Sequence, residues 1–266
     1  MQQRGRVLII AGSDPSGGAG IQADIKAVTM MGAYAASAIT ALTVQNTLGV
    51  TDVLPIEADF VKAQIRSVLS DIGADCIKTG MLHDAAVIEA VAASVKAESY
   101  EGQLVVDPVM VATSGDPLLK AEAVDAMKTR LLPLATVVTP NIPEAEVLTG
   151  MEIHTVADMR EAAEKILSLG PKAVCMKGGH LEGNKLTDLL VMPNEDEFLA
   201  EAEKIDTRHT HGTGCTFASA MAAELSKGER LEDAFFAAHS FVYDAIKVAP
   251  QLGAGHGPLG HAYVRS

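Results

Sequence analysis

The sequence predicts an α/β protein in which helices pack in layers against a mostly parallel sheet. Apolar runs of strand length alternate with amphipathic runs of helix length along most of the chain, the order that parallel strands with crossover helices require. Several apolar runs are continuous rather than alternating, as expected for strands buried on both faces. No linker, charge block, low-complexity tract or repeat interrupts the 266 residues, so we expect a single domain spanning 1–266.

The first strand is predicted at residues 6–13, where the run RVLIIAGS is bounded by glycine. A helix follows at residues 18–32, because Ile21, Ile25 and Val28 recur at helical spacing and a glycine ends the segment. The same alternation continues, with strands predicted at 35–46, 74–80, 103–110, 135–141 and 173–179 and helices at 58–73, 84–98, 117–133 and 156–170.

After these alternating elements, the chain is expected to end on a strand pair and two helices. The segments 186–192 and 197–205 are predicted to pair antiparallel across the turn PNED. The closing helices are predicted near 214–227 and 231–248. In sheets of this kind, ligands bind outside the carboxyl ends of the strands. Five polar residues fall at or just after such ends: Asp14, Lys78, Asp107, Asn141 and Lys177.

Composition narrows the possible partners and compartments. The formal net charge of −13 repels nucleic acid and anionic lipid, so we expect no nucleic acid and no membrane partner. The three cysteines are too few and too scattered for a disulfide framework or a zinc site, and Cys76 and Cys175 are interpreted as buried core thiols. The N-terminal segment does not fit a signal peptide, and no window approaches the eighteen or so apolar residues of a membrane span, so we expect a cytoplasmic protein.

The segment AGSDPSGGAGIQAD connects the first predicted strand to the first helix. Glycines let a backbone approach a ligand closely, and a helix N-terminus favours an anion or a polar group. A plain strand-to-helix turn would explain two glycines, and the spacing fits neither a dinucleotide fingerprint nor a Walker loop. The segment holds more than a plain turn needs, namely Gly12, Gly17, Gly18, Gly20, Asp14 and Asp24. We therefore favour a functional loop.

Polar side chains also follow three later strands. Asp107, taken alone, is best explained as a turn aspartate before Pro108. Asn141 and Glu144 suit a helix N-terminus, where a glutamate complements the helix dipole; the alternative is that they act through Mg²⁺ and its waters, with Asp107 completing an acidic patch. Lys177 is either an ordinary strand-end lysine or a charge that neutralises a phosphate.

The segment HTHGTGCTFASAMAAEL leads into a helix with a thiol at its start. Successive amides at a helix N-terminus form an anion hole. The same position predicts that the pKa of the Cys215 thiol is lowered from about 8.5, so that Cys215 could take a proton or hydrogen-bond an attacking hydroxyl. The alternative is a small buried thiol packed under the helix, which the glycines before it make less attractive. The residues of this loop are Thr210, Gly212, Thr213 and Gly214.

Four histidines lie in or near these motifs: His180, His209, His211 and His256. None shows metal-ligand spacing, so hydrogen bonds that shape the loops are their expected role.

Taken together, the motifs resemble the hydroxymethylpyrimidine/phosphomethylpyrimidine kinases of thiamine biosynthesis, within the ribokinase-like superfamily. The resemblance covers essentially the whole chain. It rests on AGSDPSGGAGIQAD, ALTVQNTLGV, KTGML, VVDPVM, TPNIPEAEVLTG, KGGH, DTRHTHGTGC and GAGHGPL. It implies a ribokinase-like three-layer α/β/α fold with a mostly parallel central sheet and a small β lid, for which the segment TALTVQNTLGVTDV is the candidate.

The resemblance implies ATP-dependent phosphorylation of 4-amino-5-hydroxymethyl-2-methylpyrimidine, and then of its monophosphate to the diphosphate. Many ribokinase-like enzymes have an aspartate as the base after the Gly-x-Gly loop, and Cys215 takes that place here. Cys215 is therefore expected to be catalytic, with Gly212, Thr213 and Gly214 forming the anion hole. The relatives are commonly dimers, so a homodimer is expected.

The resemblance also implies which residues hold each ligand. The amide of Gln45 can both donate and accept hydrogen bonds to the pyrimidine. The other substrate-binding residues are expected to be Met81, Val109, Gly12 and Asp24. Those for ATP are Lys177, Thr210 and Asp107, and those for Mg²⁺ are Asn141, Glu144 and Asp107.

Two other functions stay open from the sequence. A pyridoxal or pyridoxine kinase would act on a ring of similar size with a hydroxymethyl arm, but Gln45 within ALTVQN favours the pyrimidine. A pyrimidine-binding sensor without catalysis would have no use for a magnesium and phosphoryl-transfer apparatus. Release of ADP that depends on an added acceptor would separate these three possibilities.

Overall fold

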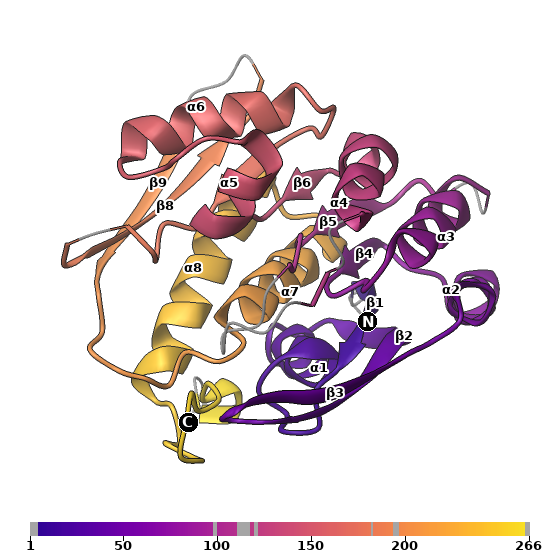
Figure 1. Ribbon diagram of the computed structural model, residues 1–266, viewed down its shortest axis with the longest axis horizontal. Helices are drawn as coiled ribbons and strands as arrows, with labels where there is room; N and C mark the ends of the chain where they lie inside the picture. The colour runs from indigo at the N-terminus through magenta and orange to yellow at the C-terminus, as the bar shows by residue number, and fades with distance from the viewer. Residues whose placement is uncertain are drawn as a thin grey trace.

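A single sheet runs through the residues that the computed structural model describes, 5–97, 100–110, 118–119, 122–181, 183–193 and 197–263. Its strand order is β3-β2-β1-β4-β5-β6-β7-β8-β9 (Figure 1). The strands are β1 (Arg6–Ser13), β2 (Tyr34–Asn46), β3 (Gly49–Pro55), β4 (Cys76–Thr79), β5 (Gln103–Val106), β6 (Val137–Val138), β7 (Val174–Met176), β8 (Lys185–Val191) and β9 (Phe198–Glu203).

The centre of the sheet is parallel and its two edges are antiparallel. The strands β2, β1, β4, β5, β6 and β7 pair parallel in that order. At one edge β3 pairs antiparallel with β2, and at the other β8 and β9 continue the sheet antiparallel from β7. This confirms the mostly parallel sheet and the antiparallel pair predicted at 186–192 and 197–205. The segment named as the candidate lid forms parts of β2 and β3, which pair antiparallel.

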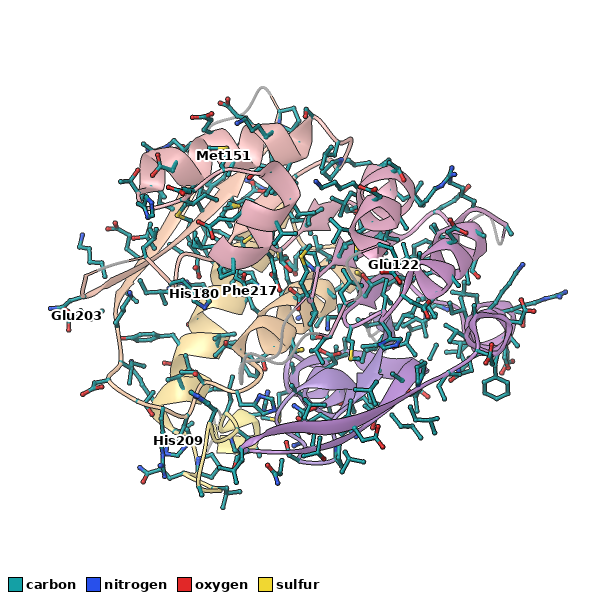
Figure 2. All side chains as sticks on the ribbon, in the orientation of Figure 1. Glu122, Met151, His180, Glu203, His209 and Phe217 are labelled. Atoms are coloured by element: carbon teal, nitrogen blue, oxygen red, sulfur yellow. The ribbon has the colours of Figure 1, made fainter. Side chains whose placement is uncertain are left out.

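The helices are α1 (Gly20–Met30), α2 (Ala58–Asp71), α3 (Ala85–Ala97), α4 (Ala123–Ala126), α5 (Ile142–Thr149), α6 (Val156–Leu167), α7 (Thr213–Ser226) and α8 (Leu231–Lys247). They cover both faces of the sheet, because successive side chains of a strand point to opposite sides. On β1, Leu8 and Ile10 pack in a core with α2 through α6, while Val7 and Ile9 pack in a second core with α1, α7 and α8. Side chains fill both interlayer spaces (Figure 2), which confirms the three-layer fold.

Across the described ranges, no helix combines the length and the apolar character that crossing a membrane requires.

One predicted helix is broken in the structure. Within the predicted range 117–133, α4 is followed by a π-helical turn at Met127–Leu131 and a 3₁₀ turn at Leu132–Leu134. Pro133 has no N–H group and so cannot extend the α-helical hydrogen bonding. Residues 117, 120 and 121 lie outside the described residues.

Candidate active site

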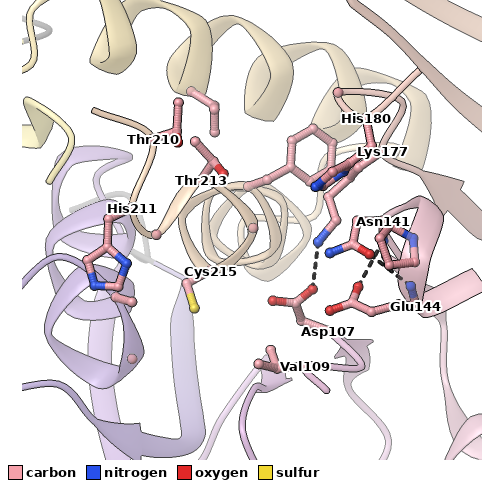
Figure 3. A pocket seen from close by; sticks show the side chains of 18 of the residues that line it. Asp107, Val109, Asn141, Glu144, Lys177, His180, Thr210, His211, Thr213 and Cys215 are labelled. Carbon is pink, nitrogen blue, oxygen red and sulfur yellow. Dashed lines mark hydrogen bonds and ion pairs between the residues drawn. The ribbon is translucent and has the colours of Figure 1, made fainter. Parts of the chain in front are cut away.

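A cavity of about 610 Å³ opens at the carboxyl ends of the parallel strands, where the fold predicts ligand binding. His180, before β8, and Phe217, on α7, are among its lining residues (Figure 2). Thirteen of the fourteen site residues predicted from the sequence also line it: Gly12, Gln45, Met81, Asp107, Val109, Asn141, Glu144, Lys177, Thr210, Gly212, Thr213, Gly214 and Cys215. The structure thus brings together side chains from across the chain (Figure 3).

The fourteenth residue, Asp24, lies outside the cavity lining. It is fully buried on α1, where its Oδ1 accepts hydrogen bonds from Lys78 Nζ at 2.8 Å and Ser219 Oγ at 2.7 Å. The prediction that Asp24 contacts the substrate is therefore wrong, and Asp24 lies buried beneath the cavity. Lys78 was noted as a strand-end residue, but its burial inside the fold and its partner were not anticipated.

The N-terminus of α7 forms one wall of the cavity. Gly212 is its N-cap residue and has a positive φ of 85°, and a side chain at this position would overlap the Gly18 carbonyl oxygen of the other glycine-rich loop. The first amides of a helix have no acceptor within it, so those of Gly214 and Cys215 can bind an anion. A Cβ on Gly214 would lie 3.0 Å from Lys177 Nζ, so glycine keeps this cradle open.

Lys177 and Asp107 form an ion pair across two neighbouring loops. Lys177 Nζ lies 2.9 Å from Asp107 Oδ1, and Thr139 Oγ1 donates to the same oxygen at 3.0 Å. Burial acts to lower the pKa of Lys177, but the carboxylates of Asp107 and Glu144 outweigh it and raise that pKa. Lys177 therefore stays protonated and can neutralise a phosphate.

Asn141 and Glu144 begin α5 with a capping box. The Glu144 N–H donates to Asn141 Oδ1 at 2.9 Å, and the Asn141 N–H donates to Glu144 Oε2 at 2.8 Å. The helix-start interpretation is thus confirmed. Burial raises the pKa of Glu144 to about 7, with Asp107 adding to the rise and Lys177 opposing it.

The same residues bear on magnesium. Within the described ranges, no cluster of three or more His, Cys, Asp or Glu could by itself hold a metal ion. Asp107 Oδ2 nevertheless faces the start of α7, 3.8 Å from where a Cβ on Gly214 would lie. Mg²⁺ prefers oxygen ligands and commonly keeps several waters and phosphates, so this donor set fits an ion that the phosphates themselves bring.

The opposite wall of the cavity carries Gln45. The strand period of β2 turns Thr43 and Gln45 toward the cavity and Leu42 and Val44 away from it. Thr43 Oγ1 lies 3.2 Å from Gln45 Oε1, while Gln45 Nε2 lies 3.4 Å from His211 Nε2. The hydrogen bond from Thr43 Oγ1 to Gln45 Oε1 fixes the orientation of the amide at the cavity wall.

His211 is fixed from its other side by Asp14, with Nε2 and Oδ2 2.8 Å apart. Because a carboxylate can only accept, the proton between them sits on His211 Nε2, and the Gln45 amide stays free to donate elsewhere. Burial acts to raise the pKa of Asp14, but hydrogen bonds from His211, Ser16 and Ala19 lower it to about 2. The loop-shaping role predicted for His211 agrees with this geometry, although its partner was not foreseen.

Cys215 lies between these two walls (Figure 3) and is half-buried. The predicted lowering of its pKa is wrong, because burial raises that pKa to about 12. Lys78 and the Gly20 amide act to lower the pKa, while Asp24 and Asp107 act to raise it. The helix N-terminus is therefore not enough to offset burial. Cys76 and Cys175 are both buried in the core that packs with α1, α7 and α8, as predicted.

Some lining residues were not predicted to contact a ligand. Helix α8 contributes Val242, Tyr243 and Ile246, and β8 contributes Asp188. Asp188 accepts hydrogen bonds from the Gly178 N–H at 2.9 Å and from His239 Nδ1 at 2.9 Å, so it supports the loop that carries Lys177. A helix was predicted near 231–248, but its sequence gave no signal that it would line this cavity.

Known proteins resemble the chain along nearly its whole length. Residues 14–260 match the family model described as phosphomethylpyrimidine kinase. A hydroxymethylpyrimidine/phosphomethylpyrimidine kinase of Haemophilus influenzae is 46% identical over 264 residues, which cover 98% of each chain. The thiamine biosynthesis bifunctional protein ThiED of Geobacter sulfurreducens is 48% identical over 97% of this chain, which spans about half, 52%, of that longer relative.

A solved structure also resembles the chain along nearly its whole length. The ADP complex of Bacillus subtilis pyridoxal kinase has a TM-score of 0.90 and 41% identity, and the match covers 99% of both chains. The similar proteins thus include kinases named for two different ring substrates.

Proposed function

Since the chain belongs to the phosphomethylpyrimidine kinase family, we propose that it transfers phosphate from ATP to hydroxymethylpyrimidine, and then to the resulting monophosphate, in thiamine biosynthesis. One observation carries the proposal. A single cavity holds the open N-terminus of α7 and Lys177 on one wall, Gln45 on the other, and the Cys215 thiol between them. This is the arrangement that an in-line transfer between two bound substrates needs.

The phosphates of ATP would bind the wall formed by Thr210, the loop at 212–214 and Lys177. The amides of Gly214 and Cys215 point where charge develops on the transferred group, and fixed amide dipoles need no reorganisation during transfer. Lys177, held by Asp107 at 2.9 Å, adds a positive charge that stays in place. These groups position the donor and stabilise the charge of the transferred group.

The pyrimidine ring would bind against Gln45, with Met81, Val109 and Gly12 as further walls. The Gln45 amide offers one donor and one acceptor to a ring nitrogen and its exocyclic amine. Cys215 would then face the hydroxymethyl arm. In its thiolate form Cys215 accepts the alcohol proton as the new oxygen–phosphorus bond forms, and the bridging oxygen leaves with ADP.

Magnesium is part of this proposal. A bound Mg²⁺ would neutralise phosphate oxygens. Asp107, Asn141 and Glu144 are the residues that would hold it, largely through water. The raised pKa of Glu144, about 7, means that a nearby cation would also favour its ionised form.

We further propose that residues 1–266 form one kinase domain that assembles as a homodimer. Leu42 and Leu54 lie directly opposite each other on β2 and β3, and Val44 follows two residues along the same face. All three side chains are exposed, and an apolar patch of this kind favours association with another protein surface. A second copy of this chain is the proposed partner. Cytoplasmic location stays a prediction from the sequence.

A second candidate is phosphorylation of pyridoxal. The observation that favours it is the TM-score of 0.90 to the pyridoxal kinase of Bacillus subtilis. The cavity walls fit either ring, because both acceptors carry a hydroxymethyl arm. A binding protein without catalysis would not need Lys177, Asp107 and Cys215 arranged in this way.

Coupled ADP release from the purified protein with Mg·ATP tests the proposal. The acceptors are hydroxymethylpyrimidine, its monophosphate, pyridoxal, and none. Turnover with both pyrimidines, and little with pyridoxal, is expected. Dominant turnover with pyridoxal would favour the second candidate, and no turnover with any acceptor would overturn both.

A further inference from the structure

A buried ion pair lies beneath the cavity, and the reaction proposed above makes no use of it. Lys78 at the end of β4 and Asp24 on α1 have side chains that are 0% exposed, with Nζ and Oδ1 2.8 Å apart. Ser219 on α7 donates to the same oxygen. Asp24 Oδ2 is buried and has no hydrogen-bond partner within the described part of the chain.

This pair lies one helical turn below the thiol. Ser219 follows Cys215 by four residues on α7, and Asp24 follows Gly20 by four residues on α1. Residues four apart share a helix face and are separated by about 6 Å along the axis. The Gly20 amide donates to the Cys215 thiol. The thiol and the ion pair therefore occupy successive turns of one contact between α1 and α7.

Stability alone does not account for this pair. Removing two charges from water is costly, and apolar residues of similar volume often stabilise a core as well or better. The positive charge nevertheless persists: burial acts to lower the pKa of Lys78, but Asp24, then Cys215 and Asp107, outweigh it and raise that pKa. A lasting buried positive charge next to a nucleophilic sulfur has a chemical use.

We propose that Lys78 is a positioning residue that stabilises the thiolate of Cys215, and that Asp24 and Ser219 hold its ammonium group under the sulfur. The inference rests on the proposed role of Cys215 as the base. The thiol first loses its proton to solvent in the cavity. During transfer, the O–H bond of the acceptor breaks, its proton goes to Sγ, its electron pair forms the bond to phosphorus, and Lys78 keeps its own proton.

The charged groups that face the thiol come from four elements. Lys78 from β4 and Lys177 after β7 favour the thiolate, whereas Asp24 from α1 and Asp107 after β5 oppose it. Among these charges, Lys78 has the largest influence on the pKa of Cys215. The sign of each influence can be tested by changing one charge at a time.

The test is the rate at which iodoacetamide alkylates Cys215 as a function of pH, followed by peptide mass spectrometry on the full chain without ATP or acceptor. Only the thiolate reacts, so the rate follows the thiolate fraction. Lys78→Met should raise the pKa of Cys215 and slow alkylation at fixed pH by about tenfold or more, since one pKa unit is a factor of ten. Asp24→Asn should also slow alkylation, though by less than Lys78→Met, because Asp24 keeps Lys78 charged and in place.

Two matched variants serve as controls. Lys78→Arg keeps the charge and should retain most of the wild-type rate, and Ser219→Ala removes one hydrogen bond but no charge, so it should shift the profile less than either charge change. Cys76 and Cys175 are fully buried and report any loosening of the core. A purely structural pair would leave the Lys78→Met profile in place or would shift the Lys78→Arg profile as far as that of Lys78→Met, and either result overturns the proposal.

The test decides even if one variant fails to fold. Asn at position 24 preserves shape, so Asp24→Asn alone overturns the proposal if alkylation does not become slower. The measurement uses no substrate, so it is independent of the kinase reaction. If these shifts are seen but the Cys215→Ala variant turns over normally, Lys78 acts on the thiol as proposed and Cys215 is not the base.

Discussion

The two walls of the cavity are built from different kinds of contact. On the phosphate side, Lys177 and Asp107 form an ion pair at 2.9 Å, and Glu144 is held by the capping box that starts α5. On the ring side, Gln45 and His211 lie 3.4 Å apart, and the Asp14 carboxylate is occupied by hydrogen bonds from the glycine-rich loop and from His211. The phosphate side thus offers charged groups to a ligand, whereas the ring side offers the side-chain amide of Gln45.

This difference predicts a division of labour. A polyanion such as ATP needs fixed charge and open amides, whereas an uncharged ring needs donors and acceptors of the right spacing. Changes on the phosphate side should therefore affect ATP, and changes on the ring side should affect the acceptor. Cys215, between the walls, should affect the transfer itself.

The largest effect is expected at Cys215. Cys215→Ala should lower kcat by about 100- to 10,000-fold, the usual contribution of a general base, with little change in the KM for ATP. Steady-state kinetics at saturating acceptor measure both. Cys76→Ala is the matched control, because that thiol does not line the cavity, and it should turn over normally. If the kcat of Cys215→Ala stayed close to that of the wild type, Cys215 would not be the general base.

Lys177 tests the phosphate side. Lys177→Met should raise the KM for ATP by about 10- to 100-fold, the range of a lost hydrogen bond to a charged group, and leave the KM for the acceptor nearly unchanged. Lys177→Arg should lose less, because it keeps the charge. Lys172→Met, at an exposed lysine on the same segment, should behave as wild type. An equal rise in both KM values would break the division between the walls.

Asp14 tests what holds the ring side in place. The pKa of Asp14 lies at about 2, below its ordinary value of 3.8, so the ionised form stabilises the fold above about pH 4 and the gain is lost as pH falls toward 2. Asp14→Asn should lower the free energy of unfolding at pH 7 by about 2 kcal/mol. Denaturant unfolding at pH 7 and pH 3 checks this.

At the lower pH the difference between Asp14→Asn and wild type should shrink, because both then carry a neutral group for part of the time. Asp52→Asn, at an exposed position on β3, is the matched control and should change stability little. A gap that stays constant with pH would mean that packing, and not the charge of Asp14, explains the loss.

Gln45 gives the smallest effect. Gln45→Ala should raise the KM for hydroxymethylpyrimidine by about tenfold, the upper range for one neutral hydrogen bond, and leave the KM for ATP unchanged within the same protein. The same substitution should raise the KM for pyridoxal less than it raises the KM for hydroxymethylpyrimidine. An unchanged KM for the pyrimidine would show that Gln45 does not bind the ring.

The residues of the two walls were predicted from the sequence in different ways. Asp107, Asn141 and Lys177 could be placed because parallel strands bring their carboxyl ends to one edge of the sheet, and each residue comes at or shortly after the end of an apolar run. Gln45 and Met81 entered through a resemblance to known kinases, and the structure does line the cavity with both. The alternation of apolar runs likewise predicted helices layered on a mostly parallel sheet, and the resemblance added the three-layer arrangement.

Contacts between distant segments could not be predicted in the same way. Asp14 and His211 are 197 positions apart, and nothing in their spacing links them. The pKa of Cys215 was predicted with the wrong sign because the rule for helix N-termini takes no account of burial. The helix predicted at 117–133 passes into a π-helical turn at Met127–Leu131 and a 3₁₀ turn at Leu132–Leu134, which its apolar pattern did not indicate. Burial and contacts between distant residues arise only when the chain folds, so local sequence patterns do not predict them.

The most direct test of the central claim is the pH dependence of the transfer step itself. In a single turnover with saturating Mg·ATP and hydroxymethylpyrimidine, the rate should follow the thiolate fraction of Cys215. With a pKa of about 12, that fraction rises about tenfold for each pH unit below it, so the rate should climb steadily between about pH 6 and pH 9. A flat profile over this range would contradict a reaction in which the Cys215 thiolate takes the proton.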